Sequence, residues 1–381
     1  MSASTVGTAL PPRAECGINL DAIRHNVRSL ARRLDNAQFW AVVKANAYGH
    51  DVDRVCDVVV PAGAKRLCVA TLSEARHLRQ GIGIRVPMLI MGPLDAASMR
   101  RAVDLDVSIT VLSWNMIDAL EHVVRADGRP ARIHLKVDTG MGRWGIPEES
   151  LDAALDRIAA CPGVELEGIM THFATADDPS SDFFDQQRDR FEHVVARVRE
   201  RSPHVIAHAA NSAATLRDSS AHFDAVRCGI ALYGMSPAQG DPAAEDLRPA
   251  MSVRSYVADI RTLQPGQSVG YCRTFVAEEP CRIALVPIGY ADGVARLLSN
   301  RGEALVGGRR HTMVGNVSMD HMSLLVDEQV NAGDVVTVLG ADGDDRILAE
   351  DHARWAGTIN YEVTCGVAGE PRLARSHAGA E

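Results

Sequence analysis

Residues 133–172 read IHLKVDTGMGRWGIPEESLDAALDRIAACPGVELEGIMTH and contain one complete copy of the pattern that decides the fold. The apolar run IHLKVD (133–138) predicts a buried strand, and LEGIMTH (166–172) predicts a second one. Between them, LDAALDRIAA (151–160) places apolar residues at helical spacing with charges between them. A strand, a helix and a strand in this order are typical of a unit with two parallel strands.

The same alternation extends over the first two-thirds of the chain. Eight apolar runs separated by helical stretches predict a closed parallel (β/α)8 barrel of the TIM type over residues 14–240. An open doubly wound sheet is the alternative, but a glycine-rich turn usually follows its first strand, and none follows the first run here. The eight runs are FWAVVK (39–44), LCVATL (67–72), PMLIMG (87–92), VSITVL (107–112), IHLKVD (133–138), LEGIMTH (166–172), HVIAHAANS (204–212) and DAVRCGI (224–230).

The pattern changes near residue 240. The stretch 238–251 reads as a loop, and the short β-rich runs after it predict a C-terminal all-β domain over residues 241–381. Near the other end, GINLDAIRHNVRSLARRL (17–34) predicts a short strand followed by a helix, and the N-terminal residues 1–20 could add to the β domain.

Composition excludes several functional classes. With 381 residues, 46% of them hydrophobic, the chain can bury two cores. The net charge of −9 argues against nucleic acid as a partner, because phosphate binding needs a basic face. No apolar run approaches the roughly 20 residues that span a bilayer, and no signal peptide is indicated, so we expect a cytoplasmic protein. The eight cysteines form no CxxC pair, which indicates neither a metal site nor disulfides.

Active sites of such barrels lie where the strands end, so polar residues at those ends are candidates. Lys44 is such a residue. Burial would lower the pKa of its amine and make it a nucleophile toward an aldehyde. The simpler interpretation is a lysine at the rim of the barrel whose ammonium group reaches solvent. Backbone amides after the seventh and eighth runs suit a phosphate. Arg227 would form the floor of the pocket, unless it only pairs with a carboxylate such as Asp224. The strand-end candidates are Lys44, Lys136, Arg143, His172, Asn211, Ser212, Arg227, Gly229 and Ile230.

Together, a lysine, a phosphate pocket and a basic floor fit pyridoxal phosphate. Seven motifs then make a resemblance specific, and it covers nearly the whole chain, from residue 14 to NYEV (360–363). The motifs are VKANAYGH (43–50), KVDTGMGRWG (136–145), HFATAD (172–177), HAANSAATL (208–216), RCGIALYG (227–234), PIGYADG (287–293) and NVSMDH (316–321). By these motifs the chain resembles the bacterial alanine racemases, which are pyridoxal-phosphate enzymes built from a barrel and a β domain.

The resemblance implies a role for each matching residue. Lys44 would bind the cofactor covalently and act as one catalytic base, and Tyr271 would be the second base, from the partner subunit of a head-to-tail homodimer. Arg143 would contact the cofactor phenolate oxygen, and His172 would bridge Tyr271 and Arg227. Tyr290 and Met319 would line the substrate entrance, with Arg143 also at the substrate. The phosphate would be bound by Tyr48, Ser212, Gly229, Ile230 and Tyr361, with Asn211 beside them.

Two bases and one arginine explain why these residues would catalyse racemisation. Racemisation removes a proton from one face of the α-carbon and returns it on the other, which Lys44 and Tyr271 could do from opposite faces. Arg227 cannot accept a proton from the pyridine nitrogen, so the ring stays neutral, which favours racemisation over transamination. Lys136 matches a site often carboxylated by carbon dioxide, and an unmodified lysine paired with Asp138 is an equal alternative.

Four positions depart from the family pattern. Asp51 and Cys272 replace glycines, Asn316 replaces an arginine, and the tail TCGVAGEPR (364–372) lacks the usual arginine directly after Cys365. The resemblance predicts an enzyme that supplies D-alanine, with alanine as the small substrate. A racemase for serine or another small or modified amino acid is the first alternative. A related pyridoxal-phosphate decarboxylase fits less well because Arg227 stands where a glutamate is typical, and a non-enzymatic cofactor-binding protein would lack the β domain.

Overall fold

The computed structural model describes residues 12–123 and 130–379, which form two compact units. The barrel unit comprises Ala22–Arg248. The β unit combines residues 12–21 with residues 249–379. Among the described residues no helix has the length and apolar character needed to cross a membrane.

The barrel unit contains the predicted closed barrel of eight parallel strands. Each strand pairs in parallel with its neighbours, and the pairing of β10 with β2 closes the ring. The predicted (β/α)8 architecture is therefore confirmed, and each of the eight apolar runs overlaps one strand. The strands, in order around the barrel, are β2 (Gln38–Val42), β3 (Arg66–Val69), β4 (Met88–Ile90), β5 (Ser108–Val111), β6 (Ala131–Asp138), β8 (Val164–Met170), β9 (Ile206–His208) and β10 (Ala225–Cys228).

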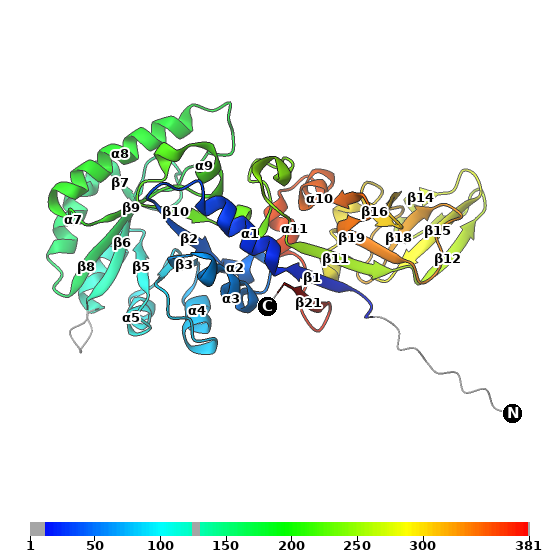
Figure 1. The fold of residues 1–381 in the computed structure, drawn as a ribbon, viewed down its shortest axis with the longest axis horizontal. Coiled ribbons are helices and arrows are strands. Elements are labelled where there is room, and N and C mark those ends of the chain that lie inside the picture. The colour runs from blue at the N-terminus through cyan, green and yellow to red at the C-terminus, as the bar shows by residue number, and fades with distance from the viewer. Residues whose placement is uncertain (1–11, 124–129, 380–381) are drawn as a thin grey trace. The chain divides into compact units, whose positions relative to one another are not determined.

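The helices of this unit lie outside the strands (Figure 1). They bury one face each, as α7 shows with Leu151, Ala154, Leu155 and Ile158 at helical spacing. The helices predicted over 151–160 and 184–202 correspond to α7 and α8. The helices are α1 (Leu20–Ala31), α2 (Lys44–Tyr48), α3 (Val52–Ala62), α4 (Leu72–Arg76), α5 (Ala96–Asp104), α6 (Trp114–Asp118), α7 (Leu151–Ala159), α8 (Phe183–Arg201) and α9 (Ser212–Arg217); the short β7 (Ile146–Pro147) extends β6.

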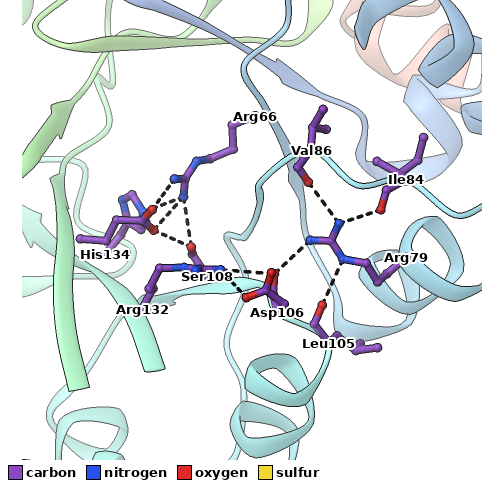
Figure 2. A network of polar contacts seen from close by, with 10 residues as sticks. Arg66, Arg79, Ile84, Val86, Leu105, Asp106, Ser108, Arg132 and His134 are labelled. Carbon is purple, nitrogen blue, oxygen red and sulfur yellow. Dashed lines mark hydrogen bonds and ion pairs between the residues drawn. The ribbon is translucent and has the colours of Figure 1, made fainter. Parts of the chain in front are cut away.

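The Arg79 side chain joins two loops that precede barrel strands. The Arg79 guanidinium donates to the backbone carbonyl oxygens of Ile84, Val86, Leu105 and Asp106 at 2.6–3.2 Å, as Figure 2 shows. These contacts join the loop before β4 to the loop before β5. A guanidinium suits this position because its five N–H donors can serve several carbonyl groups at once.

The β unit contains the predicted β sheets, most of whose strands pair antiparallel. In its largest sheet, of order β17-β16-β19-β11-β1-β21, β1 (Glu15–Asn19) pairs antiparallel with β11 and parallel with β21. Two short helices, α10 (Ala349–Ala356) and α11 (Asn360–Cys365), were not foreseen. The remaining strands are β11 (Met251–Tyr256), β12 (Asp259–Leu263), β13 (Ser268–Val269), β14 (Phe275–Val276), β15 (Cys281–Val286), β16 (Glu303–Val306), β17 (Arg309–Thr312), β18 (Met322–Val326), β19 (Val335–Asp342), β20 (Asp345–Ile347) and β21 (Ala374–Ala378).

Candidate active site

Lys44 follows β2 and opens a turn of left-handed helix. Ala45, Asn46 and Ala47 have φ of 52–54° and ψ of 48–51°, and Tyr48 has φ of 54°. The amide of Gly49 donates to the carbonyl oxygen of Ala45 at 3.0 Å, so the turn closes like an ordinary helix of opposite hand. Left-handed backbone costs about 1–2 kcal/mol per L-residue, and such strain is concentrated at functional sites. The surroundings must therefore hold this turn in place.

Glu74 stabilises this left-handed turn through three hydrogen bonds to backbone amides. Its Oε1 accepts the amide of Ala45 at 2.7 Å, and its Oε2 accepts the amides of Ala70 and Thr71 at 2.8 and 3.0 Å. Glu74 is also the third residue of α4, whose N-terminus forms a capping box with Thr71. One carboxylate thus ties the lysine-bearing turn to the end of β3. The sequence analysis missed this residue, although its Thr-x-x-Glu spacing was a readable signal.

Tyr48, Ser212, Gly229 and Ile230 lie together at the ends of β2, β9 and β10. Ser212 Oγ accepts the amides of Gly229 and Ala231 at 3.0 and 3.3 Å. A Cβ on Gly229 would stand only 2.4 Å from the Tyr48 hydroxyl, so glycine is what allows this approach. Ile230 is buried and begins the 3₁₀ turn Ile230–Tyr233.

Two neighbours support this cluster. Asn211 caps α9 by accepting the amide of Ala214 at 3.0 Å, which places Ser212 at the first position of that helix. Tyr233, which the sequence analysis missed, packs beneath Tyr48 with ring centroids 5.0 Å apart. The Tyr233 hydroxyl donates to the carbonyl oxygen of Val42 at 2.8 Å, so this tyrosine joins β10 to the strand that ends before Lys44.

Arg227 is buried in β10 and does not pair with Asp224. Its Nη1 donates to His208 Nδ1 at 2.7 Å and to the His208 carbonyl at 2.8 Å, and its Nη2 donates to the Thr171 and Ala209 carbonyls at 2.9 and 2.8 Å. Asp224 instead accepts Arg199 and the amide of Ala207. The ion-pair alternative is therefore wrong. Burial lowers the pKa of Arg227 to about 10, which still leaves a cation at neutral pH.

His172 and Arg227 are adjacent, with 3.2 Å between His172 Nδ1 and Arg227 Nη2. Burial, then the positive charge of Arg227, lowers the pKa of His172 well below its ordinary value. His172 is neutral at pH 7 as a result, and its Nδ1 accepts from the guanidinium because an arginine can only donate. The proton of the imidazole therefore sits on Nε2.

Lys136 lies on β6 with a residual exposure of 4%, and Arg143 lies on the exposed loop beyond it. Burial, followed by the charges of Arg143 and Arg227, lowers the pKa of Lys136 to about 8. Asp138 accepts the amides of Gly140 and Gly142 at 3.0–3.1 Å. Among the described residues no ion pair joins Lys136 to Asp138. The structure therefore gives no support to that alternative, and an amine with a pKa near 8 can react with carbon dioxide.

Tyr271, Tyr290, Met319 and Tyr361 belong to the β unit. Tyr271 is 73% exposed in the turn Tyr271–Arg273, and Asn316 Nδ2 donates to its carbonyl oxygen at 2.9 Å. The Tyr290 amide donates to the Ser318 carbonyl at 3.0 Å, which places the exposed Tyr290 and Met319 side chains on adjoining loops. Tyr361 lies on α11.

Three of the four departures now have a structural setting. Asp51 and Cys272, at positions where the family usually has glycine, have φ of 69° and 61°, in the region that favours glycine. Asn316 holds the Tyr271 turn through its side-chain amide. Nothing in the structure explains the absence of an arginine directly after Cys365.

The fold and the strand-end residues define a barrel enzyme with an appended β unit. The alanine racemase N-terminal domain matches residues 18–237, and the alanine racemase C-terminal domain matches residues 250–376. Alanine racemase 2 of Caldanaerobacter subterraneus is 40% identical, over 94% of this chain and 92% of that protein.

Solved structures agree with this match. Alanine racemase of Streptomyces lavendulae has a TM-score of 0.89 at 37% identity, covering 97% of this chain and 98% of that one. Alanine racemase of Bartonella henselae, solved with covalently bound pyridoxal phosphate, has a TM-score of 0.88 at 28% identity, covering 96% and 100%. The chain belongs to the alanine racemase family.

Proposed function

We propose that this protein is a pyridoxal-phosphate-dependent racemase that interconverts L- and D-alanine. The observation that carries the proposal is the setting of Lys44, on a strained left-handed turn held beside the cluster of Tyr48, Ser212 and Gly229. Strain of this kind fixes the direction of one side chain at the cost of stability, as expected of a reactive lysine. The alanine racemases that match nearly the whole chain support the same activity.

The barrel residues fit the cofactor. The hydroxyl groups of Tyr48 and Ser212 and the amide of Ile230 are donors suited to a phosphate. Gly229, whose own amide donates to Ser212 Oγ, would leave space for the phosphate beside Tyr48. The Nη groups of Arg227 face five protein acceptors, His172 Nδ1 at 3.2 Å among them, and among the described residues none accepts from its Nε. This N–H is the donor that would meet a pyridine nitrogen. Asn211 shapes the phosphate site, Arg143 would reach the phenolate oxygen, and Tyr361 would add a phosphate contact.

The bound cofactor withdraws electrons from the substrate α-carbon, which makes the α-proton removable. Lys44 would exchange that proton on one face through its Nζ. Tyr271 would exchange it on the other face through its hydroxyl oxygen. A tyrosine has an ordinary pKa of about 10, so the cationic Arg227, through His172, is the group that would favour its deprotonated form. Since Arg227 does not accept protons, the proton stays between the two bases and the substrate.

Alanine is proposed as the substrate, bounded by Tyr290 and Met319, with Arg143 at its carboxylate. A panel of L-amino acids incubated with enzyme and pyridoxal phosphate, read by chiral chromatography, tests this proposal. The highest kcat/KM should be for alanine. A higher value for serine would make serine the substrate, and no racemisation of any small amino acid would contradict the proposal. The predicted cytoplasmic location is tested by cell fractionation.

The lysine assignment has an unusually clean test because the chain contains only three lysines: Lys44, Lys65 and Lys136. Borohydride reduction of the loaded protein should leave the cofactor on Lys44, as read by peptide mass spectrometry. Lys44→Ala should lose the label and the activity, and the exposed Lys65→Arg should keep both. A label on Lys65 or Lys136 would refute the assignment.

We further propose a head-to-tail homodimer in which each Lys44 works with Tyr271 of the partner subunit. Two bases on opposite faces of a flat cofactor require a second body over the barrel mouth, and two-fold symmetry supplies it twice. Mixing inactive Lys44→Ala with inactive Tyr271→Phe subunits should restore up to about a quarter of the sites, since one of two hybrid sites carries neither change. Background activity after demonstrated subunit exchange would exclude the shared site.

A further inference from the structure

A continuous line of polar side chains crosses the interior of the barrel behind Arg227. It runs from Glu167 on β8 through His134 on β6 and His208 on β9 to Arg227 on β10. His134 and His208 have no exposed surface, and Arg227 retains 3%. The contacts are 2.9 Å from Glu167 Oε2 to His134 Nε2, 2.8 Å from His134 Nδ1 to His208 Nε2, and 2.7 Å from His208 Nδ1 to Arg227 Nη1.

The two ends of this line together fix the direction of its hydrogen bonds, because Arg227 can only donate and the Glu167 carboxylate can only accept. Arg227 has donors and no acceptor, so His208 Nδ1 must present a lone pair. The proton of His208 therefore sits on Nε2 and is donated to His134 Nδ1. His134 in turn carries its proton on Nε2 and donates it to Glu167. Arg66 Nη1 also lies 3.0 Å from His134 Nε2, but its two hydrogens have Glu167 Oε2 and Ser108 Oγ as acceptors at 2.9 and 3.1 Å. The opposite tautomer of His208 would set two buried donors against each other, which is costly where both side chains are shielded from solvent.

A bulge in β8 and a glycine beside it allow the Glu167 side chain to reach His134. The pairing of β6 with β8 shifts by one residue, so Ile133 faces Leu166 and His134 faces Gly168, and Glu167 is the extra residue of a bulge. Bulges turn a side chain out of the regular alternation. A Cβ on Gly168 would stand 2.0 Å from His134 Nδ1, so the imidazole occupies the space that this glycine leaves open.

Glu167 is held as a carboxylate by its other partners. Arg66 donates to both of its oxygens at 2.9 and 2.5 Å, and Ser108 Oγ donates at 2.5 Å. Figure 2 shows Arg66, Ser108 and His134 converging on this point. Burial raises the pKa of Glu167, but the hydrogen bonds from His134 and Arg66 outweigh it and bring the pKa below its ordinary value. Burial also lowers the pKa of His134 to about 4, so the imidazole is neutral.

We propose that Glu167 is a positioning residue that acts on Arg227 through the fixed tautomers of His134 and His208. By keeping a lone pair of His208 against Nη1, the line holds the guanidinium in the one orientation that leaves Nε–H as its free donor. The effect on cofactor binding rests on the proposed function, whereas the tautomers are a property of the protein alone.

The tautomers are measured in the cofactor-free protein by long-range ¹H–¹⁵N correlation of labelled histidines, assigned with His134→Gln and His208→Gln. Both imidazoles should be neutral with the proton on Nε2. Glu167→Leu removes the terminal acceptor and leaves Arg66 Nη1, 3.0 Å from His134 Nε2, as a donor that competes with Arg227 from the other end of the line. The variant should therefore give mixed tautomers at both histidines. Glu167→Gln, which keeps an acceptor oxygen, should restore the wild-type tautomers. Asp224→Asn, which removes an arginine-paired carboxylate outside the line, is the matched control and should change neither.

A proton on Nδ1 of His208 in the wild-type protein overturns the proposal, and this result does not depend on whether any variant folds. Unchanged tautomers in folded Glu167→Leu also overturn it. With the cofactor, Glu167→Leu should weaken pyridoxal-phosphate binding about tenfold, while Glu167→Gln and Asp224→Asn stay near the wild type. If Glu167→Leu has mixed tautomers but binds pyridoxal phosphate as tightly as the wild type, Glu167 does not act on cofactor binding through Arg227. Wild-type protein with the expected tautomers but no cofactor binding would contradict the proposed function instead.

Discussion

Replacing Gly229 with alanine tests the phosphate site without removing any of its functional groups. The new Cβ would stand 2.4 Å from the Tyr48 hydroxyl oxygen and 2.9 Å from Cζ, whereas unstrained contacts begin near 3.5 Å. The hydroxyl must therefore retreat by about 1 Å. Tyr48 is buried against Tyr233, so the ring has little room to follow. The φ of Gly229 is −114°, outside the left-handed region, so the substitution tests space and not handedness.

The expected loss follows from one hydrogen bond to a charged phosphate, about 1.5–3 kcal/mol. At about 1.4 kcal/mol per factor of ten, the pyridoxal-phosphate dissociation constant should rise roughly 10- to 150-fold. Overpacking should lower the free energy of unfolding by about 1–3 kcal/mol. Absorbance titration of the cofactor-free protein measures the first effect, and denaturant melts measure the second.

Two controls isolate the cause. Tyr48→Phe deletes the hydroxyl without adding a methyl group and should weaken cofactor binding to a similar extent. Gly240→Ala adds the same methyl group where the nearest atom is 4.0 Å away, and it should leave affinity unchanged. If Gly229→Ala binds the cofactor as tightly as the wild type while Tyr48→Phe does not, the close approach of Tyr48 to Gly229 has no part in phosphate binding.

Three further outcomes are expected. The pKa of Lys136 is lowered from 10.5 to about 8, so between these pH values the unfolded chain binds more protons than the folded chain. The free energy of unfolding should therefore rise with pH across this window, in buffer free of carbon dioxide. Lys136→Met should abolish the rise in melts from pH 7.5 to 10.5, and a variant curve parallel to that of the wild type would refute the lowered pKa of Lys136. Cys272 has a φ of 61°, so Cys272→Gly should relieve backbone strain and raise Tm by roughly 1–4 °C. The control Cys365→Gly, within α11, should lower Tm. A lower Tm for Cys272→Gly would show that the backbone at position 272 is not strained. Asn316→Asp removes the side-chain donor to the Tyr271 carbonyl oxygen and should lower kcat about 5- to 30-fold while cofactor affinity stays unchanged. An unaltered kcat would show that the Tyr271 turn does not depend on this hydrogen bond.

The barrel strands could be predicted from sequence because each is buried on both faces and reads as a short apolar run. The ends of these runs were less informative. The run 204–212 contains the strand Ile206–His208 and then continues through alanines that belong to the turn before α9. Alanine contributes to an apolar run without favouring a strand, so hydrophobicity alone extends the strand too far.

The left-handed turn after Lys44 had no comparable signal. Left-handed backbone is expected at glycine or asparagine, yet this turn contains two alanines and a tyrosine as well as Asn46. Tertiary contacts hold it, with Glu74 receiving the amide of Ala45 and Asn46 Oδ1 receiving the amide of Val52 at 2.9 Å. The line from Glu167 to Arg227 was equally out of reach, because a bulge sets the direction of Glu167 and strict alternation does not foresee it.

Simple strand geometry could have decided one of the open alternatives in advance. Asp224 and Arg227 are three residues apart along an extended segment, so their side chains point to opposite faces and cannot pair. The same rule places Lys136 and Asp138, two residues apart, on one face, and there it would have favoured an ion pair. Asp138 is instead taken by the amides of Gly140 and Gly142, because backbone donors in the adjoining turn must be satisfied first. Alternation can exclude a contact, but only the competition for each acceptor decides which of the permitted contacts forms.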